Sequence, residues 1–127
     1  MSTTTFRNNM RITGNLRVEG AMSAAFVTGT AVAGAATVNG TDAKITTEAL
    51  TTAQNGVYTL TVTNPAVAAA DIVLASVANG TNTQGSPVVT RVQPGAGSVV
   101  ILVANLHASA QAFNGTLVVS FLVIKAA

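Results

Sequence analysis

Alternating apolar and polar residues along the chain predict an all-β protein. Residues 57–63 show the pattern most clearly, because every second residue there is apolar and the residues between are threonines. A period of two is typical of a strand that buries one face and exposes the other. Related patterns predict further strands at about residues 36–39, 43–50, 71–78, 87–93, 98–105 and 115–125.

The last of these segments, residues 115–125, is apolar on both faces. One face carries Leu117, Val119, Phe121 and Val123, and the other carries Val118, Leu122 and Ile124. A strand with one solvated face would alternate, so this strand needs apolar cover on two sides. We expect the first face in the core. The second either packs on another layer of the same subunit or forms an oligomer interface through Val118, Leu122 and Ile124.

The turn signals recur at short spacing between these segments. They are the four pairs Asn39-Gly40, Asn55-Gly56, Asn79-Gly80 and Asn114-Gly115, together with Gly85–Pro87 and Pro94–Gly97. Asn-Gly supplies the positive φ of tight hairpins, so we expect hairpin turns at the four pairs. Residues 47–54 are also compatible with a short helix capped by Thr46 or Thr47. The fold class predicted is an all-β antiparallel β-sandwich or jelly-roll-like body with essentially no helix.

The first part of the chain has a different pattern. Met10 and Ile12, then Leu16 and Val18, flank a Gly-Asn turn, and such a small hairpin is not stable alone. We therefore expect it to lean on the body or on another chain. Residues 21–36, rich in Ala, Gly and Thr, suggest a strand plus linker. The predicted organisation is an extended N-terminal arm and linker over residues 1–35 and a β-sandwich body over residues 36–127.

Charge is scarce in this chain. Its 127 residues are 49% hydrophobic and 8% charged, with a net charge of +2 and no cysteine, whereas soluble domains average about 25% charged residues. No apolar run reaches the length of a membrane helix, and no signal-peptide pattern follows the polar first residues. The cations are not clustered as in nucleic-acid-binding proteins. These features favour large contacts between subunits, without a membrane or nucleic-acid partner.

No motif in the sequence announces catalysis. A triad can be composed from Ser109, His107 and Asp71, but the Gly-x-Ser-x-Gly elbow is absent. The carboxylates Glu19, Asp42, Glu48 and Asp71 are dispersed, and we expect them at solvated positions or strand edges. His107 is the only histidine, so a metal site lacks partner ligands. We expect no enzyme activity, no cofactor and no metal site, and we interpret the three Asn-Gly-Thr tripeptides as turns rather than glycosylation acceptors.

From about Ala43 to its end, the chain resembles small tailed-bacteriophage virion proteins of the capsid cement, or decoration, type. The resemblance lies in Lys44–Ala53, Tyr58–Asn64, Asn79–Gly85, Pro94–Ile101 and Phe113–Leu117 with the terminal apolar strand. In the arm, Ile12–Gly20 is similar to segments that begin trimeric phage fibres. These matches are patterns of strands and turns rather than a catalytic signature.

The resemblance implies a homotrimeric β-sandwich made in the cytoplasm of the host bacterium and located on the outer capsid surface of the virion. There it would bind the major capsid protein and reinforce the shell. The arm would contact the capsid or a neighbouring subunit through Phe6, Arg7, Met10, Arg11, Ile12, Leu16, Arg17 and Val18. The alternative is a fibre, tailspike or head-fibre module that binds a host receptor or glycan through polar loops such as residues 79–87.

Overall fold

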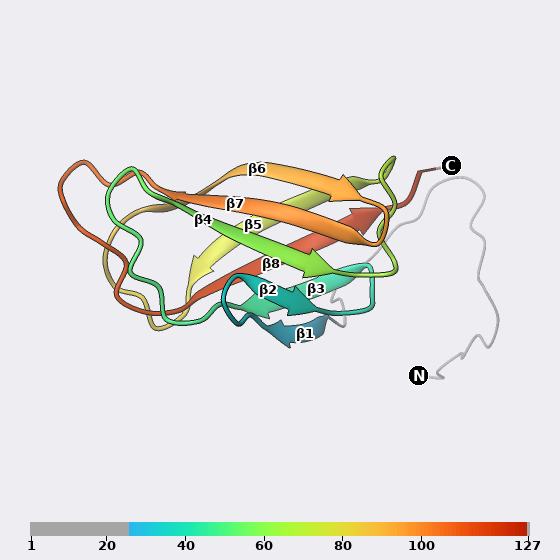
Figure 1. The fold of residues 1–127 in the computed structure, drawn as a ribbon, viewed down its shortest axis with the longest axis horizontal. Coiled ribbons are helices and arrows are strands. Elements are labelled where there is room, and N and C mark those ends of the chain that lie inside the picture. The colour runs from blue at the N-terminus through green and yellow to red at the C-terminus, as the bar shows by residue number, and fades with distance from the viewer. Residues whose placement is uncertain (1–25, 127) are drawn as a thin grey trace, which may run out of the picture.

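Two four-stranded β-sheets pack face to face in the computed structural model, which describes residues 26–126 (Figure 1). Within these residues there is no helix, so the predicted all-β sandwich is confirmed. Sheet A has the strand order β1-β3-β8-β5, and sheet B has the order β2-β4-β7-β6. The strands of sheet A are β1 Val27–Thr30, β3 Asp42–Thr46, β5 Ile72–Asn79 and β8 Leu117–Ile124. Those of sheet B are β2 Ala35–Thr37, β4 Val57–Thr63, β6 Pro87–Gly95 and β7 Ser98–Asn105.

Each sheet contains one parallel pair, β1 with β3 and β2 with β4, and its other pairs are antiparallel. The parallel pairs arise because the chain changes sheet after β1, after β2 and after β3. Two such crossings return it to the original sheet in the original direction. Residues 27–30, within the segment interpreted as a strand plus linker, form β1 at one edge of sheet A.

The hairpin predictions at the four Asn-Gly pairs were wrong. Each pair lies in, or in the case of Asn79 at the strand end that begins, a connection between strands of different sheets, and of these eight residues only Asn55 has a positive φ, 63°. The connection between β6 and β7 joins two paired strands, and Gly97 turns it with a φ of 75°. A local turn signal marks where the chain reverses. Which strand it pairs with next depends on where the following apolar face can be buried.

The core fills the space between the two sheets. Its most buried side chains include Ile45, Leu60, Val62, Val99, Ile101, Val103, Leu117, Val119 and Phe121. In β4 every second residue is buried. In β8 the four residues of the predicted inner face, Leu117, Val119, Phe121 and Val123, are all buried. The predicted alternation of β4 and the predicted buried face of β8 are therefore confirmed. The inner faces of the two sheets hold only part of the apolar residues, so other apolar side chains lie on the outer faces.

The predicted strand 43–50 continues only as far as Thr46, and residues 47–54 form neither strand nor helix. Their polar groups bond instead to the connection that precedes β8. The Leu117 amide donates to Thr47 Oγ1 over 2.9 Å, and the Leu50 amide donates to the Gly115 carbonyl over 2.9 Å. These partners lie far away in the sequence, and they replace the local hydrogen bonds of a strand or a helix.

Candidate assembly surface

The outer face of sheet A carries large apolar side chains in contact with solvent. Ile72 and Leu74 of β5 are 59% and 55% exposed, and Leu122 and Ile124 of β8 are 42% and 43% exposed. The strand register places Ile72 opposite Ile124 and Leu74 opposite Leu122. Residues that face each other across an antiparallel pair bring their side chains into contact. The four side chains therefore form one apolar patch, which we call the β5–β8 patch.

An open hollow of about 240 Å³ adjoins this patch. It is lined by Phe26, Leu74, Ala75, Ser76, Ser120, Phe121 and Leu122. The Phe26 ring is 40% exposed, and Lys44 Nζ lies 5.4 Å from its centroid. That separation suits a cation–π contact. The hollow is therefore an apolar depression on the outer face of sheet A, with a single ammonium group beside its aromatic wall.

The outer face of sheet B is different. Thr59, Thr61 and Thr63 of β4 point outward there, and the register places Thr59 opposite Leu102 and Thr61 opposite Val100. Leu102 and Val100 of β7 are only half-exposed. Polar residues thus flank the second apolar face of β7, the threonines of β4 on one side and Arg91 and Gln93 of β6 on the other, while Ile72 and Leu74 of β5 have apolar partners in β8. Of the two outer faces, sheet A presents the better surface for assembly.

The predicted interface residues Val118, Leu122 and Ile124 all lie on the outer face of sheet A, with Val118 half-buried. Ile72, Leu74 and Phe26 were not named as interface residues. The signal for the first two was available, because residues 71–77 share the two-sided apolar pattern. The predicted arm contacts Phe6, Arg7, Met10, Arg11, Ile12, Leu16, Arg17 and Val18 lie outside the described residues.

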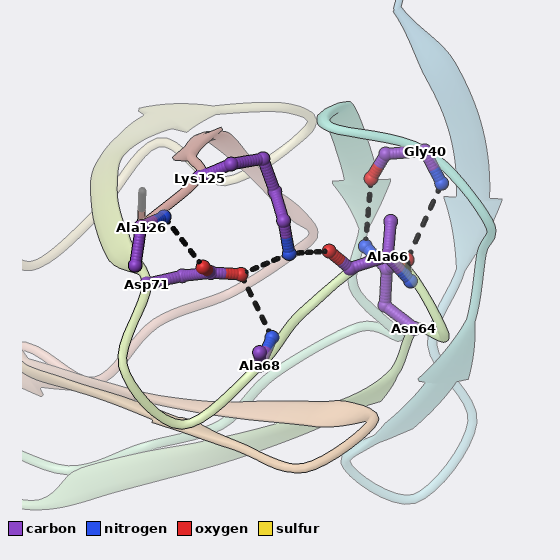
Figure 2. A network of polar contacts seen from close by, with 7 residues as sticks. All are labelled: Gly40, Asn64, Ala66, Ala68, Asp71, Lys125 and Ala126. Atoms are coloured by element: carbon purple, nitrogen blue, oxygen red, sulfur yellow. Dashed lines mark hydrogen bonds and ion pairs between the residues drawn. The ribbon is translucent and has the colours of Figure 1, made fainter.

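A polar clasp fixes the end of β8 that carries Ile124 (Figure 2). The Asp71 carboxylate forms an ion pair with Lys125 and accepts hydrogen bonds from the amides of Ala68 (2.8 Å) and Ala126 (3.0 Å). Lys125 also donates to the Ala66 carbonyl over 2.7 Å. The hydrogen bond from Lys125, followed by those from the two amides, lowers the pKa of Asp71 to about 2. The clasp holds the terminal strand against the start of β5.

Asn64 fixes the neighbouring connections at the same end of the sandwich, as Figure 2 shows. Its amide nitrogen donates to the Gly40 carbonyl over 2.8 Å, and its side-chain oxygen accepts from the amides of Gly40 (3.3 Å) and Ala66 (3.1 Å). The Asn64 backbone amide donates to Gly97 in the β6–β7 turn. This buried residue thereby ties three connections together, two through its side chain and the third through its backbone amide.

At the opposite end, two Asn-Gly-Thr tripeptides pack against each other. The amide of Thr81 donates to Thr116 Oγ1 and the amide of Thr116 donates to Thr81 Oγ1, each over 2.9 Å. A Cβ on Gly80 would lie 2.3 Å from Thr116 Oγ1, and one on Gly115 would lie 2.6 Å from Thr81 Oγ1. The two glycines permit this close approach, which joins the connection after β5 to the connection before β8.

Asn105 and Asn82 complete the polar packing at this end. Asn105 is fully buried and donates to the carbonyls of Thr52 (3.0 Å) and Gln111 (2.7 Å). Its side-chain oxygen accepts from the amides of Ser86 (3.0 Å) and His107 (3.3 Å). Asn82 donates to Asn79 and Gln84 and accepts from the Asn114 amide. Hydrogen bonds to the buried side chains of Asn105 and Asn82 therefore hold these polar loops in fixed positions.

The expectation of solvated or strand-edge carboxylates was wrong for two residues. Asp71 is buried in the clasp, and Glu48 is half-buried. Glu48 accepts hydrogen bonds from the Gly34 amide and from the Tyr58 hydroxyl, each over 2.9 Å. Burial, followed by the hydrogen bond and the negative charge of Glu48, raises the pKa of Tyr58 well above its usual range. Both carboxylates anchor structure, because each accepts a hydrogen bond from a segment distant in the sequence, Asp71 from Ala126 and Glu48 from Gly34.

The residues of the possible triad do not come together. Ser109 and His107 are neighbours in one turn, where the Ser109 amide donates to His107 Nδ1 over 3.1 Å. Asp71 bonds instead to Ala126, beyond the end of β8. His107 lies in the connection that leads to the start of β8, so the length of that strand, about 23 Å, separates the two groups. In the described part of the chain, no three His, Asp or Glu side chains are grouped to hold a metal ion.

No family model, curated protein or solved structure matches this chain. Among residues 26–126 there is also no helix long and apolar enough to cross a membrane.

Proposed function

We propose that this protein is a structural virion protein of the capsid cement type. In this role it binds the outside of a phage head as a homotrimer, contacts the major capsid protein and reinforces the shell. The β5–β8 patch is the observation that carries the proposal. The resemblance of its strand and turn segments to capsid cement proteins is the reason for proposing that this assembly takes place on a phage head.

The β5–β8 patch supports assembly for two physical reasons. It places four exposed aliphatic side chains side by side on a sheet, and larger exposed apolar surfaces on stable proteins usually mark interaction sites. The clasp at Asp71 and the buried asparagines hold that sheet in position, so little order has to be gained when a neighbour binds. Many such subunits on one shell would add weak contacts into strong avidity.

The number of copies in purified virions tests this role. A cement protein should be present in proportion to the capsid subunits and be distributed over the head. Quantitative mass spectrometry of virions and a reconstruction of the particle would measure both. A copy number restricted to a few sites on the particle would contradict the cement role.

Removal of residues 1–20 tests the proposed contribution of the arm to capsid binding. The shortened protein should remain a soluble trimer, since the β5–β8 patch lies in the sandwich, but it should no longer bind capsid shells in a sedimentation assay. Full decoration of shells by the shortened protein would show that the arm is not the capsid contact.

One observation favours the alternative, a fibre or head-fibre module that binds a host receptor or glycan. The exposed residues Thr81, Thr83 and Asn114 form an ordered polar end, in which Thr83 and Asn114 exchange two hydrogen bonds of 2.8 Å. Ordered polar loops at one end of a rigid scaffold are common binding sites. Specific binding of the protein to host cells, lost on Thr83→Ala and Asn114→Ala substitution, would support this alternative.

A further inference from the structure

Phe26 lies on the outer face of sheet A, although the strand that follows it forms the edge of that sheet. The ring lines the hollow together with Leu74 of β5 and Leu122 of β8. In the order β1-β3-β8-β5, β8 is two strands away from β1 and β5 is three strands away. The Phe26 side chain therefore reaches over the outer face from the residue directly before β1. The 25 residues that precede Phe26 are attached to the protein at this point.

The hollow is suited to apolar side chains of a polypeptide. Its volume of about 240 Å³ lies below the range of about 300–1,000 Å³ that is usual for small-molecule pockets. Its walls are mostly apolar, with Ser76 and Ser120 as the polar members. One or two aliphatic side chains would fill it and would also cover the adjoining Leu74 and Leu122.

The chain supplies such side chains within reach. Met10, Ile12, Leu16 and Val18 are apolar, and they alternate with polar residues around the Gly-Asn turn. Val18 stands eight positions before Phe26, and eight extended residues span at most about 26 Å. That length reaches across the outer face of a four-stranded sheet whose strands lie about 4.8 Å apart. Because the segment is tethered beside the hollow, its effective concentration there is high.

We propose that residues 10–18 of the same chain dock on the outer face of sheet A, with an apolar side chain of this segment in the hollow beside Phe26. The period of two would then direct Arg11 and Arg17 away from the sheet, where they remain available to an acidic partner. Ile72 and Ile124 lie outside the hollow, so they stay available to a neighbouring subunit. The inference does not rest on the virion role, because the face and the segment are the same whatever the protein binds.

Disulfide trapping in the full chain tests this contact, and the absence of native cysteine makes it simple. Ser76→Cys in the hollow is combined in turn with Ile12→Cys, Leu16→Cys or Val18→Cys and oxidised with oxidised glutathione. The matched control replaces Ser76→Cys by Thr61→Cys, an exposed position on the outer face of sheet B. Intact mass and non-reducing denaturing gels distinguish a disulfide within one chain from one between chains.

We expect a disulfide within one chain for at least one pair with Ser76→Cys and none with Thr61→Cys. Disulfide-linked oligomers would show that the hollow holds the segment of a second copy and would overturn the proposal. Absence of any disulfide, or equal trapping at both positions, would overturn it as well. None of these outcomes depends on whether the protein binds capsids, so failure here is distinct from failure of the proposed function.

Trypsin gives a second measurement that needs no cysteine. Arg11 and Arg17 lie within the docked segment, so their peptide bonds should be cleaved slowly while it is docked. Leu122→Asp should release the segment and increase the cleavage rate on the order of tenfold, because proteolysis follows the population of the open form. Thr61→Asp, the matched charge on sheet B, should leave the rate unchanged. Equal rates in all three proteins would contradict docking.

Discussion

Asn105 is a single residue whose side chain determines the arrangement of three connections. It provides two donors to carbonyls and accepts two amides while fully buried. Asn105→Ala would remove the side-chain partner of these four backbone groups. The Thr52 carbonyl still accepts from the Phe113 amide, and each buried group left without a partner costs about 1–3 kcal/mol. Because the loops can relax, we expect a total loss of about 2–4 kcal/mol in the free energy of unfolding.

Urea unfolding followed by circular dichroism would measure this loss. The matched control is Asn39→Ala, a change at an exposed asparagine of another connection, where we expect a change within about 0.5 kcal/mol. Similar losses for both variants would show that Asn105 has no special role in joining the connections.

The Asp71 carboxylate makes stability depend on acid pH. Its pKa is lowered from 3.8 to about 2 in the folded protein, so the folded state favours the charged carboxylate. The stabilisation is complete above the unfolded pKa of about 4 and is lost as the pH falls toward 2. The difference in denaturation midpoint between wild type and Asp71→Asn should therefore be largest above about pH 5 and shrink as the pH falls to about 2.

Lys125→Met is the companion variant for this prediction. It removes the first contributor to the lowered pKa but leaves the Ala68 and Ala126 amides as donors. Its acid sensitivity should be intermediate between those of wild type and Asp71→Asn. A pH-independent difference between wild type and Asp71→Asn would show that the clasp does not stabilise the charged carboxylate preferentially.

At the scale of the element, β8 has one face in the core and one face toward solvent. Phe121 is buried in the core, whereas Ile124 of the same strand points outward and is 43% exposed. Phe121→Asp would place a charge among apolar side chains and should unfold the protomer, since such burial costs several kcal/mol. Ile124→Asp, which lies outside the hollow, should leave a folded protomer that fails to form the proposed trimer.

Circular dichroism and light scattering together would distinguish these outcomes. Thr61→Asp on sheet B is the control and should remain both folded and trimeric. If Ile124→Asp also remains trimeric, the outer face of sheet A is not the subunit contact. If it unfolds like Phe121→Asp, β8 is ordinary core on both sides.

The sequence predicted the bounds of a strand correctly where neighbouring residues alone determine them. The bounds of β4 and β7 agree with the predicted 57–63 and 98–105, because alternation or two-sided apolar character marks them and turn residues end them. Thr47 could not be placed in this way, since its hydroxyl bonds to an amide 70 positions away. The Asn-Gly pairs marked real changes of direction, but the change from one sheet to the other depends on the packing of both sheets.

The candidate surface was predictable to a similar extent. The two-sided pattern of residues 115–125 indicated Leu122 and Ile124, which the structure places on the exposed face. The hollow was not predictable, because it requires Phe26 to lie beside residues from β5 and β8. No local pattern in residues 21–36 specifies that contact.

At the scale of the whole molecule, the net charge belongs to the first 25 residues. Arg7, Arg11, Arg17 and Glu19 precede Phe26, whereas the residues from 26 onward carry Lys44, Arg91 and Lys125 against Asp42, Glu48 and Asp71. The sandwich is therefore formally neutral, and its exposed β5–β8 patch is apolar. The proposed contacts of the arm with capsid shells and of the patch with other subunits should consequently respond differently to salt.

Binding to capsid shells through the arm should weaken when NaCl is raised from about 0.05 M to about 0.5 M, because salt screens exposed charges separated by more than several ångströms. The proposed trimer should persist over the same range, since simple salts do not weaken apolar contacts in this way. Shell sedimentation and light scattering would measure the two properties in parallel.

The triple variant Arg7→Gln, Arg11→Gln and Arg17→Gln should bind shells weakly and with little salt dependence. Arg91→Gln, which removes a cation from sheet B, is the control and should behave like wild type. If the trimer and shell binding are lost at one common salt concentration, a single surface performs both tasks. If Arg91→Gln weakens shell binding as much as the triple variant does, shell binding depends on total charge rather than on the arm.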